Sequence, residues 1–244
     1  MNTIRMDVEY DGTDFAGWQR QSGEIPTVQA SVESVLSRIL QEEIRIVGAG
    51  RTDRGVHARS QTASFTTGSP MELGRLMHST NSLLPRTVRV SGMRLVSPDF
   101  HARFSATARE YRYFLLESPS AIDGRFAGCC HMKPDLTVMN SLASMLVGSH
   151  DFTSFSKEDP QQSNAICTVT GARWYRYGRF HVFQITANRF LRSMVRFLVA
   201  AMVEAGTGGF GEEKFRGMLR GEDRSPQLVP AQPSGLFLWK VFYP

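Results

Sequence analysis

The sequence predicts an α+β fold made of two similar halves, each with the element order β-α-β-β-α-β. Short runs of alternating apolar residues are typical of strands, and apolar residues three or four positions apart are typical of helices. These patterns follow one another in the same order twice along the 244 residues. A chain of this length can bury a core in each half.

In the first half, strands are expected at residues 4–10, 44–47, 61–66 and 87–96. A helix is expected after Thr27, whose hydroxyl can cap it, because apolar residues between 28 and 40 recur at helical spacing. Residues 69–72 read Ser-Pro-Met-Glu, which is the pattern of a capping box with proline at the first helical position. A second helix is therefore expected to begin there.

The second half repeats this order. Strands are expected at residues 110–116, 166–177, 179–187 and 236–243, and helices at 136–147, 189–205 and, as a short extra element, 212–219. The two middle strands should form a hairpin that turns near Gly178. The resulting domains, residues 1–105 and 106–244, are of the ferredoxin-like or RRM-like type with largely antiparallel sheets. We expect the two halves to meet around a basic cleft.

The charge of the chain suggests a nucleic-acid partner. The net charge is +5, and only four of the 28 basic residues are lysines, so the rest are arginines. Arginine binds phosphate through two parallel hydrogen bonds and stacks on flat rings. Residues 173–180 interleave arginine with aromatic residues, as RNA-binding surfaces do. The alternative is a general bias toward arginine with a solvated face.

Other classes of protein are disfavoured. No apolar run reaches the length of a membrane span, and the N-terminus lacks the apolar core of a signal peptide. The three cysteines, two of them adjacent, form neither a disulfide framework nor a zinc spacing. A reducing, cytoplasmic setting is the default expectation.

Residues 50–58, with the sequence GRTDRGVHA, form the most informative segment. Glycines at 48, 50 and 55 allow positive φ angles and close approach of another molecule. Arg51 and Arg54 flank Asp53 and should favour its ionised form. A charged carboxylate in an open loop suits nucleophilic catalysis. The alternative is an aspartate that merely closes a turn.

Several blocks of sequence, taken together, resemble the TruA-type tRNA pseudouridine synthases. They include YDGTDFAGWQRQ and GRTDRGVHA, and they occur at residues 10–21, 50–58, 81–85, 99–113, 151–155, 190–196 and 235–238. The resemblance runs nearly from end to end. It implies isomerisation of uridine to its C-glycoside without a metal, nucleotide or organic cofactor.

The resemblance also implies roles for three residues. Asp53 matches the nucleophile, which attacks C6 of the base or C1′ of the ribose once the base has left its stack. Tyr111 matches the active-site tyrosine, which stacks under the base and could accept the C5 proton. From the residues alone, Tyr111 or the neighbouring Tyr113 could equally be a core residue. Arg196 matches the active-site arginine, expected to pair with Asp53.

Further RNA contacts are expected from Arg20, Arg51, Arg189 and Arg192. On a helical wheel Arg189 and Arg192 share one side with Arg196, although for these two a solvated basic stripe is the alternative. Arg51 could fill the space that the uridine vacates or grip its phosphate. His57 has two interpretations, either fixing the loop through a hydrogen bond or acting as an acid or base, and the first is favoured.

The family match implies, as substrate, uridines at positions 38 to 40 of the tRNA anticodon stem-loop, bound by a homodimer. A catalytically silent RNA-binding module of the same fold is the main alternative. A phosphotransfer or metal enzyme is disfavoured, because no Lys-Ser/Thr pair follows the glycines and no His/Cys cluster occurs.

Overall fold

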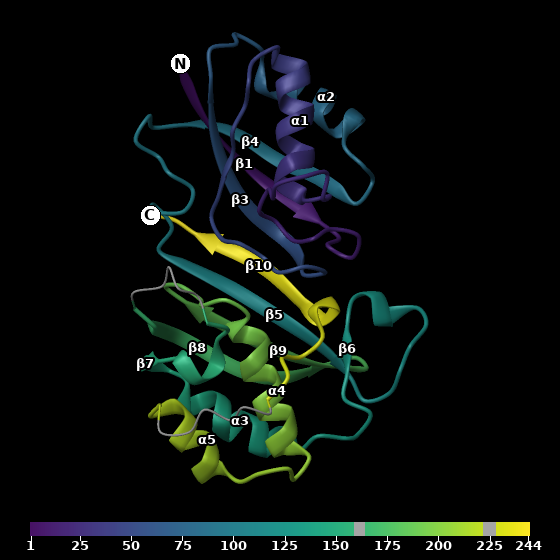
Figure 1. Ribbon diagram of the computed structural model, residues 1–244, viewed down its shortest axis with the longest axis vertical. Helices are drawn as coiled ribbons and strands as arrows, with labels where there is room; N and C mark the ends of the chain where they lie inside the picture. Colours follow the sequence, from purple (N-terminus) through teal and green to yellow (C-terminus); the bar gives the residue numbers. More distant parts are fainter. Residues whose placement is uncertain (159–163, 222–227) are drawn as a thin grey trace. The chain divides into compact units, whose positions relative to one another are not determined.

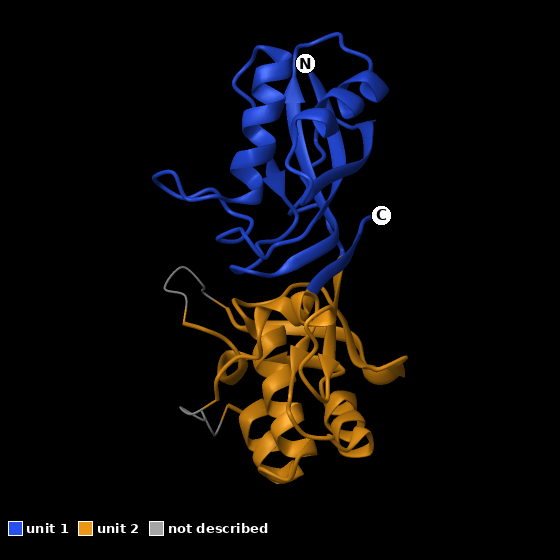
Figure 2. Ribbon diagram, turned by 90° about the vertical axis from the view of Figure 1, so that its right-hand side faces the viewer, with its two compact units in different colours: residues 1–107, 237–244 blue, residues 108–236 orange. Residues whose placement is uncertain are grey.

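The computed structural model describes residues 1–158, 164–221 and 228–244 (Figure 1). The chain divides into two compact units, coloured separately in Figure 2. Unit 1 comprises residues 1–107 and 237–244, and unit 2 comprises residues 108–236. Within the described ranges, no helix combines the length and apolar character needed to cross a membrane.

Unit 1 contains an antiparallel sheet with the strand order β4-β1-β3. A short fourth strand, β2, pairs with Ala63 and Ser64 of β3, which completes the strand order of a ferredoxin-like sheet. The strands are β1 (Asn2–Tyr10), β2 (Val47–Gly48), β3 (His57–Thr67) and β4 (Val88–Val96). The strand predicted at 44–47 is thus shorter than expected, and the Asp53 loop connects β2 to β3 as predicted.

Two helices complete the core of unit 1: α1 (Val28–Leu40) and α2 (Leu73–Leu83). In β1 alternate residues from Ile4 to Tyr10 are buried, which is the period of a strand with one covered face. In α1 the buried residues Val28, Val32 and Leu36 lie four positions apart and form one apolar stripe. The helix begins as predicted, because the Thr27 side chain accepts a hydrogen bond from the Ala30 amide.

The predicted capping box at residues 69–72 is wrong. Helix α2 begins at Leu73, and Glu72 itself is the N-cap. Its carboxylate accepts hydrogen bonds from the amides of Gly74 and Arg75 at 2.7 and 2.8 Å, which lowers the pKa of Glu72. Ser69 instead accepts from the Met71 amide before the helix starts. A carboxylate at the N-cap satisfies the same exposed amides and faces the positive end of the helix dipole.

Unit 2 contains a second antiparallel sheet with the strand order β5-β9-β8-β7, and β6 pairs in parallel with the end of β5. Its strands are β5 (Ala108–Leu116), β6 (Gly128–Cys129), β7 (Gly148–Asp151), β8 (Ile166–Tyr177) and β9 (Phe180–Ala187). The β8–β9 hairpin turns at Gly178, where φ is +56°, as predicted. Thus the middle strands of the second half are confirmed, and two short strands were not predicted.

The helices of unit 2 are α3 (Leu136–Met145), α4 (Met194–Gly206) and α5 (Glu212–Leu219), with short 3-10 turns at Asp123–Arg125, Thr153–Phe155 and Pro233–Gly235. Helices α3 and α4 pack against each other, and α3 also packs on β8. The predicted start of α4 at residue 189 is wrong, because Ser193 has a φ of +59°, a left-handed conformation that a helix cannot include. Arg189 and Arg192 therefore lie before the helix and do not share its face with Arg196.

The last strand, β10 (Leu236–Phe242), pairs in parallel with β3 through Phe237–His57 and Leu238–Ala58. Residues 237–244 accordingly belong to unit 1, whereas the sequence assigned them to the C-terminal half. The first boundary lies between residues 107 and 108, two residues beyond the one drawn from the sequence. Pairing between strands far apart in the chain leaves no local signal in either strand, so the sequence does not reveal it.

Thr27→Ala is expected to lower the free energy of unfolding by about 1–2 kcal/mol, because it removes the side-chain cap of α1. Urea denaturation followed by circular dichroism measures this change. Thr27→Ser keeps the hydroxyl and should remain close to the wild type. Equal urea midpoints for Thr27→Ala and wild type would show that the cap does not stabilise the fold.

Candidate active site

Asp53 lies on the loop between β2 and β3, and its side chain is half-buried while Arg51 and Arg54 are exposed. The turn is closed by a hydrogen bond from the Val56 amide to the Asp53 carbonyl at 3.2 Å. Gly55 takes a φ of +75° within it. The loop therefore returns the chain sharply into β3 and leaves the carboxylate partly accessible.

The loop that follows β1 holds the Asp53 loop in place. The Trp18 amide donates to the Thr52 carbonyl at 3.2 Å, and the Gly55 amide donates to the Phe15 carbonyl at 3.3 Å. The hydroxyls of Tyr10 and Thr52 are hydrogen-bonded at 2.8 Å, with both side chains buried. Contacts on both sides of Asp53 thus fix its backbone, and these roles of Tyr10 and Thr52 were not predicted from the sequence.

Two glycines make this close packing of loops possible. A Cβ on Gly12 would lie 1.9 Å from the Val56 carbonyl oxygen, far inside any van der Waals contact. A Cβ on Gly17 would lie 2.5 Å from the Thr52 carbonyl oxygen, and Gly17 has a φ of +108°. Only glycine fits at such positions. The sequence shows where these two glycines lie, but it does not show which loop they approach.

His57 supports the same arrangement. Its side chain is fully buried, and its Nδ1 accepts a hydrogen bond from the Gly12 amide at 3.0 Å. The same nitrogen lies 3.2 Å from a carboxylate oxygen of Asp11. The ring stacks on Phe237 with 4.7 Å between centroids. These contacts support the interpretation that His57 fixes the loop rather than transfers a proton.

The two arginines expected near this loop have different surroundings. Arg51 is exposed, and its Nε donates to the side-chain oxygen of Gln19 at 3.1 Å. Arg20 forms an ion pair with the buried carboxylate of Glu33 at 3.3 Å. Glu33 also accepts a hydrogen bond from the Ile46 amide, so it is held rigidly in the core. Arg51 therefore lies on the Asp53 loop itself, whereas Arg20 is tied to helix α1.

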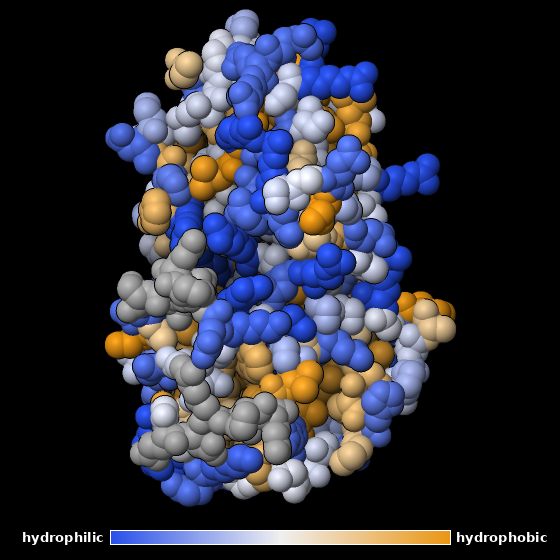
Figure 3. All heavy atoms as spheres, viewed as in Figure 1, coloured by the Kyte–Doolittle hydropathy of each residue, from blue (hydrophilic) through white to orange (hydrophobic). Residues whose placement is uncertain are grey.

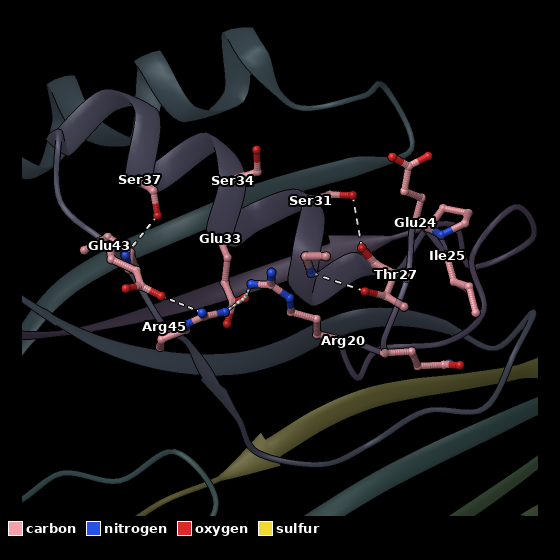
Figure 4. Close-up of a pocket in the computed structure, with 15 residues that line it drawn as sticks. Arg20, Glu24, Ile25, Thr27, Ser31, Glu33, Ser34, Ser37, Glu43 and Arg45 are labelled. Atoms are coloured by element: carbon pink, nitrogen blue, oxygen red, sulfur yellow. Dashed lines mark hydrogen bonds and ion pairs between the residues drawn. The ribbon is translucent and has the colours of Figure 1, made fainter.

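Arg20 lines a polar pocket of about 590 Å³ beside α1 (Figure 4). Three serines of the helix, Ser31, Ser34 and Ser37, also line it. Its charged and hydroxyl-bearing residues are Arg20, Glu24, Thr27, Ser31, Glu33, Ser34, Ser37, Glu43 and Arg45. Two arginines face three glutamates, and Arg45 pairs with both Glu33 and Glu43. This balance of charge does not favour a phosphate, so the pocket as a whole is not a phosphate site.

In unit 2, Tyr111 and Tyr113 are both buried in β5, on the same side of the strand. The Tyr111 ring packs edge-on against Phe190 with 4.9 Å between centroids. The Tyr113 hydroxyl donates to the Gln232 carbonyl at 3.0 Å, and burial raises the pKa of Tyr113. Tyr113 thus has the surroundings of a core tyrosine with a satisfied hydroxyl. The sequence alone had allowed this role for both Tyr111 and Tyr113.

Arg196 lies in the first turn of α4 and is half-buried. Its Nε donates to the Ala231 carbonyl at 2.7 Å, and the Ala231 amide donates back to the Arg196 carbonyl at 3.1 Å. Its positive charge counteracts part of the rise in the pKa of Tyr113, so the two groups interact electrostatically. Arg196 and Tyr111 belong to unit 2, and Asp53 belongs to unit 1.

An apolar hollow of about 410 Å³ lies beside α4, where Figure 3 shows apolar side chains gathered on the surface. Its lining includes Tyr113, Leu115, Cys129, Cys130, Val199, Val203, Leu228, Val229 and Pro230. Desolvation raises the pKa of the Cys130 thiol, and burial raises that of Cys167, elsewhere in the unit, to about 11. These thiols are therefore poor nucleophiles at neutral pH.

The remaining predicted RNA contacts are exposed. Arg189 donates to the Asn164 carbonyl at 3.1 Å, and the Arg192 carbonyl accepts from the Lys157 amide at 3.1 Å. Both arginines belong to the segment between β9 and α4. Among the residues described by the structure, no group of three or more His, Cys, Asp or Glu side chains is arranged to hold a metal ion.

Comparison with known proteins identifies close relatives. A family model described as tRNA pseudouridine synthase matches residues 6–105 and 142–244. A protein of Chlorobaculum tepidum named tRNA pseudouridine synthase A is 65% identical to this chain, over 99% of this chain and 98% of that protein. A protein of the same name from Pelodictyon phaeoclathratiforme is 56% identical to this chain over the full length of both. The solved archaeal box H/ACA Nop10–Cbf5 complex covers 93% of this chain and 59% of its own, with 13% identity and a TM-score of 0.34, too low to support an argument.

Tyr113→Phe is expected to destabilise the protein by about 1 kcal/mol, because the buried Tyr113 side chain loses its hydrogen bond to the Gln232 carbonyl. Chemical denaturation measures the loss. Tyr177→Phe makes the same chemical change at a side chain that is 67% exposed, and it should not alter stability. If both variants unfold like the wild type, the Tyr113 hydroxyl does not contribute to the core.

Proposed function

Because the chain belongs to the tRNA pseudouridine synthase family, it is an isomerase that converts uridine in tRNA to pseudouridine, and we propose that its target uridines lie in the anticodon stem-loop, at positions 38 to 40. The observation that carries the proposal is the pair of interlocked loops around Asp53, within the matched residues 6–105. They hold one partly accessible carboxylate on a backbone fixed from both sides.

Asp53 is proposed as the nucleophile. Its attack on C6 of the base or C1′ of the ribose labilises the glycosidic bond between N1 and C1′, and the base turns over. C5 then bonds to C1′, the carboxylate leaves the carbon that it attacked, and C5 loses a proton while N1 gains one. The uridine must leave its stack for the carboxylate to reach it. The fixed loop supports this role, since a nucleophile on a rigid backbone does not have to be ordered when substrate binds. Arg51, on the same exposed loop, is proposed to contact the RNA beside the extruded nucleotide.

Tyr111 and Arg196 are proposed to act on the same nucleotide. Tyr111 supplies a ring to stack on the uracil and a hydroxyl to accept the C5 proton, and its edge contact with Phe190 restricts the ring. Arg196 supplies positive charge to keep Asp53 ionised. Its hydrogen bond to the Ala231 carbonyl limits the motion of the guanidinium and so supports a positioned role.

We also propose that Arg20, Arg189 and Arg192 contribute contacts to the phosphate backbone, and that the enzyme works in the cytoplasm as a homodimer. The exposed positions of Arg189 and Arg192 and the +5 net charge support electrostatic attraction of RNA. The contribution of Arg20 is smaller, because Glu33 already neutralises part of its charge. Symmetric dimers are the common form of such oligomers.

Asp53→Asn is expected to lower the rate of pseudouridine formation by on the order of 10³-fold or more, because an amide cannot serve as the nucleophile. Its affinity for tRNA should stay within about threefold of wild type, since phosphate contacts dominate binding. Chemical mapping of pseudouridine in unmodified tRNA measures the first quantity, and filter binding measures the second.

Glu24→Gln is the control, an exposed carboxylate in the same unit that also becomes an amide. It should retain activity. A wild-type protein that binds tRNA but forms no pseudouridine would point instead to an RNA-binding module without catalysis. Modification only at tRNA positions other than 38 to 40 would overturn the proposed target uridines but not the pseudouridine synthase activity.

Tyr111→Phe separates stacking from proton transfer. If the hydroxyl accepts the C5 proton, single-turnover product formation should slow by about 10²-fold or more while tRNA affinity is unchanged. Tyr111→Ala should in addition lose the stacked ring and hence affinity. Full activity of Tyr111→Phe would leave stacking as the only role of this tyrosine. The exposed Tyr177→Phe is the control for loss of a phenol.

A further inference from the structure

Phe104, on the segment between β4 and β5, is the most exposed aromatic side chain among the residues that the structure describes. This residue is 77% exposed, and the next most exposed phenylalanine, Phe126, is only 43% exposed. Leaving a phenyl ring in water forgoes the stabilisation that burial would supply.

The exposed ring is backed by a second aromatic ring. His101 stacks on Phe104 with 4.4 Å between centroids and 27° between planes. The His101 Nδ1 accepts hydrogen bonds from the amides of Arg103 and Phe104, each at 3.2 Å, which fixes the imidazole beneath the phenyl ring. The Arg103 guanidinium lies 5.6 Å from the Phe104 centroid, within the range of a cation–π contact.

The backbone that carries these residues is anchored in unit 1. Ala102 is fully buried, its amide donates to the Ser64 hydroxyl at 3.2 Å, and its carbonyl accepts from the Tyr243 hydroxyl at 2.6 Å. Ser105 closes the turn, because its amide donates to the His101 carbonyl and its hydroxyl accepts from the His101 amide. The ring is therefore presented on an ordered turn, which reduces the entropy lost when a ligand binds.

We propose that Phe104, backed by His101 and flanked by Arg103, is a stacking platform for an unpaired base of the RNA substrate. An aromatic face beside a guanidinium is the chemistry by which proteins hold single-stranded bases, with the cation placed for the adjoining phosphate. A protein partner fits less well, because the neighbours His101, Arg103 and Ser105 are polar and the apolar area is a single ring. The proposal rests on the proposed function, since it assumes an RNA substrate.

The test compares Phe104→Ala, Phe104→Leu and Phe104→Tyr for binding of an unmodified anticodon stem-loop and for KM and kcat. Ala and Leu should weaken binding by about 5-fold to 100-fold with kcat unchanged, because both lack a ring face. Tyr keeps the face and should stay within about twofold of wild type. Ile122→Ala, at a side chain that is 85% exposed in unit 2, controls for loss of an apolar surface group.

A set of stem-loops, each with one abasic nucleotide, identifies the partner base. One substitution should weaken binding to wild type but not to Phe104→Ala, because the two losses then remove the same contact. Wild-type binding by Phe104→Ala, or by Phe104→Leu, would overturn the proposal while leaving the pseudouridine synthase activity of the wild type intact.

Melting temperature and light scattering test two other roles for the Phe104 ring, in the fold of the chain and in its self-association. A lower melting temperature of Phe104→Ala would mean that the ring is buried against the rest of the chain in solution. A change in mass by light scattering would mean that the ring joins two copies. Either result would overturn the stacking platform. Absence of pseudouridine formation by wild type would instead refute the proposed function, and the abasic series would still report on base binding.

Discussion

The packing of the loop after β1 against the loop before β3 is the constraint on which the candidate site depends. Gly12 allows the Val56 carbonyl to approach, and Gly17 does the same for Thr52. Hydrogen bonds then hold the backbone on both sides of Asp53. Since the Gly12 amide also donates to His57, the buried histidine locks the loop at its junction with β3. The carboxylate is thus positioned by contacts of the backbone on both sides of it.

Much of the fold could be predicted because its signals are local. Alternation from Ile4 to Tyr10 and the helical spacing after Thr27 place β1 and α1 correctly, and Gly178 marks the β8–β9 turn. The errors fall where local signals compete. Ser69 and Glu72 are both good caps, and only the structure shows that Glu72 performs this role. The apolar pattern of α4 extends smoothly back to residue 189, although Ser193 interrupts the helix.

The candidate site was predictable as a set of residues but not as a set of contacts. The motif around Asp53 predicts which loop carries the site. It does not reveal the hydrogen bond between Tyr10 and Thr52, because these residues lie 42 positions apart in the chain. Tyr111 and Tyr113 lie two positions apart on one strand, so the strand pattern alone did not show which of them is a core residue. The structure shows that the Tyr113 hydroxyl donates to the Gln232 carbonyl, which lies 119 residues away in the chain. Such long-range pairs are set by tertiary packing, which periodicity does not encode.

The basic composition also needs the structure for its interpretation. Arginine content predicts attraction to RNA, but a guanidinium that pairs with a carboxylate contributes little to it. Arg20 and Arg45 share Glu33 in a pocket with more acidic than basic groups, whereas Arg51 donates only to a neutral amide oxygen among its described hydrogen bonds. Net charge therefore overstates the RNA-binding surface in one part of unit 1. It also misses Phe104, whose proposed contribution to binding comes from an uncharged ring held in water by an ordered turn.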